Sequence, residues 1–261
     1  MGEASARLIV APYAWRPLNA HSFQAAPLPA TSNLLLGALP DADYQRVEGH
    51  LEWVGLAAGK AIISPGEPVT HVFFPTEGIV SVISGLADEA SVEIAIIGHE
   101  GMVGTSVLLE GVGATGPRHR SVVQVKGQGY RLRAEVLMKE FERGGKLRHW
   151  LLRHTQALIT QIAQIAVCSG QHELQAKLCR WLLQRHDRLA SAELYVTQTE
   201  IASMLGVRRE GVSETACQLQ EAGLIRYSRG HVVLLDRAGI KERACECLDV
   251  IQKEYARLLR V

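Results

Sequence analysis

Residues 196–224 read VTQTEIASMLGVRREGVSETACQLQEAGL and carry the strongest structural signal in the chain. Thr197 is followed three residues later by Glu200, and this spacing is typical of a capping box. In that arrangement each of the two side chains binds the backbone amide of the other residue. The pattern therefore predicts that a helix begins directly after Thr197.

A second helix is predicted after a short turn. Gly206 suits the left-handed backbone that ends many helices. Val212, Ala216 and Leu219 then recur at helical spacing, which predicts a helix over about residues 208–221 with these three side chains inside. Two short helices joined by a turn with glycine predict a helix-turn-helix.

The outer face of the second helix carries the chemistry. It presents Arg208, Arg209, Glu210, Ser213 and Glu214. In a DNA-binding helix-turn-helix, the first residues of the second helix meet base edges in the major groove. Arginine can donate two hydrogen bonds to guanine, and glutamate can accept one from cytosine, so the pattern favours readout of G·C pairs. A solvated face of an αα-hairpin is the alternative.

A β-hairpin wing is predicted after the second helix. Two short apolar runs between residues 224 and 235 flank the turn Ser228-Arg229-Gly230-His231. We expect Arg226, Arg229 and His231 to contact phosphates, which fixes register without reading sequence. Thr197 and Gln198, at the start of the first helix, complete the predicted DNA-binding set. From Asp236 onward, a last helix is predicted with one apolar stripe: Ile240, Ala244, Leu248, Ile251 and Tyr255.

The N-terminal half has a different texture. Between residues 51 and 132, short β-branched runs alternate with glycines, which predicts an all-β sandwich or barrel. The runs are 61–63, 72–74, 79–83, 92–97 and 122–125. Residues 1–30 contain four prolines and no clear periodicity, and we interpret them as a loosely ordered arm.

A long helix is expected between these two parts. Apolar and polar residues recur at alternating spacings of three and four from Leu147 to His172, as in a heptad repeat. The residues predicted to mediate dimerisation are Leu151, His154, Leu158, Gln161 and Ile165. A long helix packed on its own domain is the alternative.

This order of parts resembles the Crp/Fnr superfamily of bacterial transcription regulators over about residues 31–240. The resemblance is strongest at Thr197–Ile225 and weaker at Gly66-Glu67 and Gly78–Val80. It implies an α+β fold: an N-terminal jelly-roll β-barrel, a long dimerisation helix and a C-terminal winged helix-turn-helix. The implied divisions are an arm (1–30), a cyclic-nucleotide-binding-like effector domain (31–141), the dimerisation helix (142–170) and the DNA-binding domain (171–261).

The resemblance also implies function. Members are cytoplasmic homodimers that bind two-fold symmetric double-stranded DNA and act on transcription with RNA polymerase. Arg209 and Glu210 fall on the family's base-reading positions. Glu214 departs from the cyclic-AMP regulators, which usually have arginine there, so the preferred half-site is expected to differ. A ligand-binding dimeric signalling module without DNA-binding activity is the rival interpretation.

An effector site is implied in the β domain. The corresponding residues here are Gly101, Met102, Val103, Gly104, Thr105, Arg120 and Ser121. Cyclic AMP is not favoured, because no carboxylate stands at Met102 or Val103 to bind the ribose hydroxyls, and an unpaired buried hydroxyl costs about 1–3 kcal/mol. Two alternatives remain: an anionic ligand that contacts Arg120, or a β domain that binds no ligand.

The five cysteines all lie between Cys168 and Cys247, an odd and clustered set that favours a reducing compartment. The N-terminal iron–sulfur cluster of the oxygen-sensing branch is not expected, because residues 1–167 have no cysteine. Cys245 and Cys247 are a redox or metal candidate, but two ligands alone are weak, so we expect a structural role and no metal.

Composition narrows the remaining classes. The 28 Lys and Arg residues nearly balance the 27 Asp and Glu residues, for a net charge of +1, which excludes a strongly basic coat protein. No apolar run approaches the roughly 18 residues of a membrane span. Residues 111–116 match G-x-G-x-x-G, but Pro117 and a strand follow where a dinucleotide site needs a helix. We therefore expect no enzyme.

Overall fold

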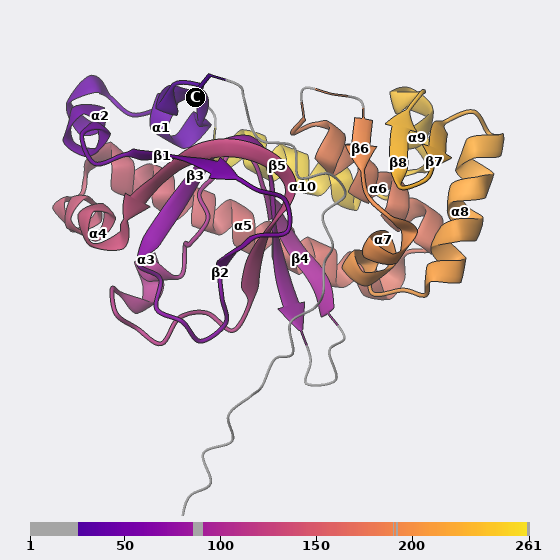
Figure 1. Cartoon of the computed structure of the whole chain (residues 1–261), viewed down its shortest axis with the longest axis horizontal. Coiled ribbons are helices and arrows are strands. Elements are labelled where there is room, and N and C mark those ends of the chain that lie inside the picture. The colour runs from indigo at the N-terminus through magenta and orange to yellow at the C-terminus, as the bar shows by residue number, and fades with distance from the viewer. Residues whose placement is uncertain (1–25, 86–90, 190, 192, 260–261) are drawn as a thin grey trace, which may run out of the picture.

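The computed structural model describes residues 26–85, 91–189, 191 and 193–259. Within these, a β domain is joined by a long helix to a C-terminal domain, and the last helix runs back toward the β domain (Figure 1). Most of the predicted N-terminal arm, residues 1–25, lies outside the described residues.

The β domain is built on one antiparallel sheet with strand order β1-β5-β3-β4, and β2 pairs with β5. Its strands are β1 (Glu52–Leu56), β2 (Ala61–Ile63), β3 (His71–Gly85), β4 (Ser91–Ile97) and β5 (Arg120–Arg133). The predicted runs 72–74 and 79–83 are one strand, β3, because register shifts between Pro75 and Val80 bend it without ending it. The bend brings Gly127 so close that a Cβ there would lie 2.0 Å from the Glu77 carbonyl oxygen.

Short helices surround the sheet: η1 (Ala30–Ser32), α1 (Leu34–Gly37), α2 (Asp41–Glu48), α3 (Val107–Glu110) and α4 (Ala134–Arg143). Buried Asn33 joins α1 to the sheet. Its side-chain oxygen accepts hydrogen bonds from Leu35 N and Leu36 N, and its amide donates to the carbonyls of Pro75 and Gly101, each at 2.8 Å. One cap thus satisfies the helix start and fixes its position.

The long helix α5 (Gly145–Gln171) begins after Gly144 and Gly145, which both have positive φ and separate it from α4. One face of α5 packs against its own β domain. Gln161 exchanges two hydrogen bonds with the backbone of Ile96 on β4, at 3.0 and 3.2 Å. Buried His154 places Nε2 3.1 Å from Met102 N and 3.0 Å from Met102 O.

The residues predicted to mediate dimerisation pack instead within their own chain. Leu151, His154, Leu158, Gln161 and Ile165 are all buried within their own chain. The opposite face of α5 is exposed and also apolar: Leu152, Ile159 and Val167 are 44%, 52% and 53% exposed. The helix has two apolar faces, and its periodicity alone does not say which one faces the β domain.

The C-terminal domain consists of α6 (Leu174–His186), β6 (Glu193–Tyr195), α7 (Gln198–Leu205), α8 (Arg209–Glu221), β7 (Ile225–Ser228), β8 (His231–Leu234) and α9 (Arg237–Arg243). The helix-turn-helix and the wing are confirmed. The wing gains a third strand, β6, in the order β6-β8-β7. The sequence analysis missed β6, because three residues with one buried side chain give almost no alternation signal.

The predicted last helix is two helices. Ala244 is extended (φ −73, ψ 148) and ends α9, and α10 (Cys247–Leu258) then begins in a new direction. Helix α10 lies along α5, and the described chain ends near α1 (Figure 1). Leu258 and Leu259 enter the core of the β domain. None of the described helices is long and apolar enough to cross a membrane.

A buried arginine joins the two domains. Arg185 of α6 is fully buried and donates to Glu93 of β4 and to Gln124 of β5, the latter at 2.7 and 2.9 Å. Ser81 of β3 donates to the same glutamate at 2.5 Å. The guanidinium lies 3.4 Å from the centre of the Trp181 ring. Burial lowers the pKa of Arg185 to about 10, so it is still charged at neutral pH.

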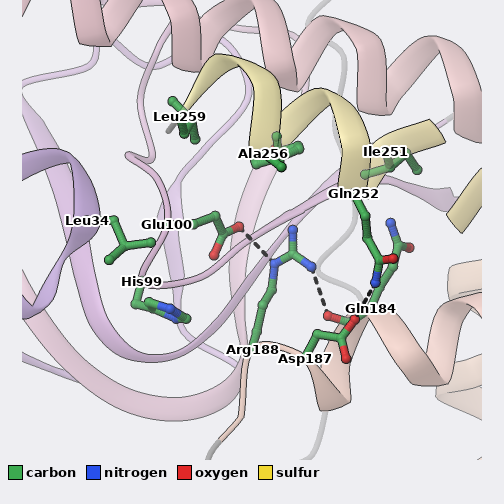
Figure 2. Close-up of a pocket in the computed structure, with 11 residues that line it drawn as sticks. Leu34, His99, Glu100, Gln184, Asp187, Arg188, Ile251, Gln252, Ala256 and Leu259 are labelled. Atoms are coloured by element: carbon green, nitrogen blue, oxygen red, sulfur yellow. Dashed lines mark hydrogen bonds and ion pairs between the residues drawn. The ribbon is translucent and has the colours of Figure 1, made fainter. Parts of the chain in front are cut away.

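A second contact forms directly after the end of α6 (Figure 2). Arg188 donates to Glu100 of the β domain at 2.8 Å and to the carbonyl of Gln184 at 2.8 Å, and Gln252 of α10 donates to Asp187 at 2.6 Å. These residues line a cavity of ≈ 320 Å³ between the β domain, α6 and α10. The junction is thus polar at both contacts, one within α6 and one just after its end.

We expect Arg185→Leu to lower the free energy of unfolding by about 3–5 kcal/mol, because it leaves the Glu93 carboxylate buried without its partner. Urea unfolding followed by tryptophan fluorescence measures this loss. The double variant Arg185→Leu/Glu93→Leu should recover most of it. Arg131→Leu is the control, since its partner Glu52 is half exposed and the expected loss is at most about 1 kcal/mol. Equal losses in Arg185→Leu and the control would contradict the assignment.

Stability should also depend on pH through His154. Burial lowers the pKa of His154 below its usual 6.5, despite the bond to Met102 and the charge of Glu100. The unfolded chain therefore binds a proton that the folded chain excludes, and stability falls as pH drops below about 6.5, by up to about 1.4 kcal/mol per pH unit.

Urea unfolding at several pH values tests this prediction. We expect His154→Gln to remove this part of the pH dependence. His149→Gln, at an exposed position on the same helix, should retain it. The same pH profile in wild type and His154→Gln would show that His154 is not responsible.

Candidate nucleic-acid interface

The start of α7 is fixed by the predicted capping box. Thr197 Oγ1 accepts a hydrogen bond from Glu200 N at 3.2 Å, and the Glu200 carboxylate accepts one from Thr197 N at 2.6 Å. Gly206 has φ 65 and ψ 39, the left-handed conformation predicted for the end of this helix. Local sequence signals thus set both ends of α7.

The inner and outer faces of α8 are also as predicted. Val212, Ala216 and Leu219 are buried in the core of the domain. The five residues predicted to read bases are all exposed: Arg208, Arg209, Glu210, Ser213 and Glu214. The first turn of α8 is therefore presented to the solvent.

A polar hollow lies beside this first turn. It has a volume of ≈ 300 Å³, and its lining comes from α7, α8 and the wing: Thr197, Gln198, Thr199, Arg209, Tyr227, Arg229 and Gly230. The N-terminus of a helix favours anions, because its first amide groups lack helical partners and the helix dipole is positive there. Two arginines beside it make the hollow suited to a phosphate group.

The wing is held in place by Tyr227. Its hydroxyl donates to Val196 O at 3.0 Å, and its backbone amide donates to Gln220 Oε1 at 2.8 Å. Burial raises the pKa of Tyr227 to about 12, so the hydroxyl stays protonated. At the tip of the hairpin, Arg229 and Gly230 have φ 49 and 78, which fits a tight two-residue turn.

The structure brings together most of the predicted DNA-binding residues. Thr197, Gln198, Arg209 and Arg229 share the hollow, and Arg226 is exposed on β7. His231 instead stacks on Tyr195, with ring centroids 4.6 Å apart. The sequence analysis missed Thr199 and Tyr227 as lining residues. Thr199 follows Gln198 in the first turn of α7. Its place beside a predicted DNA-binding residue is the sequence feature that could have identified it.

The predicted effector residues lie in a well-packed part of the β domain. Met102 and Val103 are fully buried, Ser121 is 1% exposed, and Arg120 is half-buried at the start of β5. A Cβ at Gly101 would lie 2.4 Å from the His154 ring. With a buried methionine where the family places a carboxylate, these residues do not fit the ribose of a cyclic nucleotide.

The cysteines form a group that the sequence analysis did not predict. Cys168 and His172 of α5 meet Cys245 and Cys247, and the ligand atoms of all four lie within 4.8 Å of one another. The expectation of a single helix through Cys245 and Cys247 is wrong, because they flank the break between α9 and α10. Two distant pairs of residues thus make one four-ligand set.

Comparison with known proteins agrees with this geometry. Residues 176–243 match the model of the Crp-like helix-turn-helix domain. This chain has a Crp-like helix-turn-helix domain. No curated protein matches the chain.

Solved structures with the same fold confirm the Crp/Fnr resemblance. One is a transcriptional regulator of the crp/fnr family from Eubacterium rectale, with a TM-score of 0.64 and 15% identity over 80% of this chain and 96% of that chain. FixK2 from Bradyrhizobium japonicum has a TM-score of 0.63 and 16% identity, over 75% of this chain and 98% of its own.

A CRP family transcriptional regulator from Thermus thermophilus has a TM-score of 0.60 and 22% identity, over 73% of this chain and 96% of that chain. At these identities the similarity shows the fold. Together with the Crp-like domain, it supports a DNA-binding transcription regulator and not an enzyme.

Proposed function

We propose that this chain is a homodimeric transcription regulator that reads a two-fold symmetric DNA site through the first turn of α8. One observation carries the proposal. Exposed Arg209 stands at the start of α8 and also lines the polar hollow formed by the α7 N-terminus and the wing. A base-reading residue and a phosphate-binding surface are thus adjacent, as DNA recognition requires.

The exposed side chains divide into two roles. Arg208, Arg209, Glu210, Ser213 and Glu214 face the major groove in this proposal, with Arg209 donating to guanine and Glu210 accepting from cytosine. Thr197, Gln198, Thr199, Arg226 and Arg229 contact phosphates and set the register of the domain. The family resemblance adds a cytoplasmic location and contact with RNA polymerase to the proposal.

Dimerisation is proposed through the outer face of α5. Leu152, Ile159 and Val167 recur at spacings of seven and eight residues on this face. A second copy of α5, packed in the manner of a coiled coil, covers this face and relates two Crp-like domains by a two-fold axis. The two-fold symmetry of the proposed DNA site follows from this axis.

Selection of bound duplexes from a random DNA pool tests DNA reading directly. We expect the wild-type protein to enrich a symmetric motif. Arg209→Ala should lose about 1–3 kcal/mol of binding free energy per half-site and relax the preference at one guanine. Arg257→Ala, on the distant end of α10, removes the same charge and should bind like wild type. No enriched motif with the wild-type protein would favour the ligand-binding signalling module instead.

Sedimentation velocity tests the proposed dimer face. Ile159→Asp should weaken association by about 3–6 kcal/mol, because each protomer loses one buried apolar side chain and gains a charge. Leu109→Asp, at a position 70% exposed on α3, is the matched control and should remain dimeric. A wild-type protein that is monomeric at micromolar concentration would overturn the proposed interface.

A further inference from the structure

Four potential metal ligands meet where the end of α5 lies beside the segment between α9 and α10. Cys168 lies in the last turn of α5, and His172 follows directly after that helix. Cys245 precedes α10, and Cys247 is its first residue. The break between α9 and α10 is what allows both of these cysteines to point to the same place.

The spacing of the ligand atoms fits a single ion. Around a tetrahedral zinc ion, Zn–S bonds of about 2.3 Å and a Zn–N bond of about 2.0 Å place neighbouring ligand atoms about 3.5–3.8 Å apart. Cys168 Sγ lies 3.5 Å from Cys245 Sγ, and Cys247 Sγ lies 3.5 Å from His172 Nδ1. An iron–sulfur cluster fits less well, because its thiolates bind different iron atoms and lie farther apart.

The surroundings of the four ligands are those of a metal site. Glu246 lies 3.2 Å from His172 Nε2, which leaves Nδ1 directed at the cysteines, as in carboxylate–histidine–zinc arrangements. Gln164 donates to Cys247 Sγ at 3.1 Å. Cys168, Cys245 and Cys247 are all buried. A packed cluster of neutral thiols requires none of these polar partners.

The charges also suit bound thiolates. The buried guanidinium of Arg180 lies close enough to Cys168 to attract a thiolate there. The thiolate is the form of cysteine that binds metals. Three thiolates around a divalent cation leave one net negative charge, which Arg180 balances.

We propose that Cys168, His172, Cys245 and Cys247 bind one zinc(II) ion in a closed, structural Cys3His site. Four protein ligands leave no open position for water or substrate, so the ion stabilises the structure and catalyses nothing. The site joins the end of α5 to the segment between α9 and α10. These two segments come before and after the Crp-like domain in the sequence, so the ion links the two ends of that domain. The proposal rests on ligand geometry and is independent of DNA binding.

Metal content and cobalt spectroscopy test the site. The full-length protein is reduced, incubated with zinc(II) or cobalt(II) and freed of excess metal by gel filtration. We expect one metal ion per protomer, and for cobalt the visible absorption of a tetrahedral ion with thiolate charge-transfer bands. Cys247→Ser should lose the metal. Cys217→Ser, which removes an exposed thiol from α8, should retain it and is the matched control.

A milder variant separates loss of metal binding from misfolding of the protein. Glu246→Gln leaves all four ligands in place and should weaken zinc binding about 10–100-fold, measured by competition with a chelator. The proposal is overturned if the reduced wild-type protein retains no metal, or if cobalt gives no tetrahedral spectrum. It is also overturned if Cys217→Ser loses as much metal as Cys247→Ser, because the bound metal would then lie elsewhere.

Discussion

The structure depends on one charge that has no access to water. The guanidinium of Arg185 is enclosed between two domains, and Glu93, Gln124, the Trp181 carbonyl and the Trp181 ring compensate for its lost hydration. An isolated buried charge is very costly, so α6 and the sheet must meet in a geometry that pairs it. Apolar contacts alone tolerate small shifts, whereas a buried ion pair does not. The position of the Crp-like domain on the β domain is therefore set at this residue.

Strand β4 connects this interaction to the recognition helix. Glu93 on β4 holds Arg185, and its neighbour Val92 lies against the turn between α7 and α8, where a Cβ at Gly206 would be 2.7 Å from Val92 Cγ1. Just after the end of α6, Arg188 binds Glu100, which follows β4 in sequence. Movement of one strand and its following loop would thus displace α6 and the helix-turn-helix together. Gln161 ties β4 to α5 through its two hydrogen bonds with Ile96, so a shift of β4 relative to α5 would have to break or move these bonds.

The sequence predicts best the features that arise within a few residues of one another. The capping box at Thr197, the left-handed Gly206 and the exposed arginines of α8 depend on local spacing, and the structure has each of them. It predicts poorly what depends on partners far along the chain. Arg185 and Glu93 are 92 residues apart, and nothing near either one marks it as half of a buried pair. The dimer face is hard to predict for a related reason: α5 has apolar residues on two faces, and periodicity cannot choose between them.

The cysteine set shows how such a non-local site goes unrecognised. Cys245 and Cys247 are two residues apart, which on a continuous helix places them on different sides and argues against shared coordination. The break after α9 removes that objection, and it comes from the extended backbone of Ala244, a residue with no special preference for ending a helix. The return of α10 along α5 then brings this pair to Cys168 and His172. A search of the sequence for paired ligands finds only half of the set, because the path of the chain, and not the local spacing, brings the two halves together.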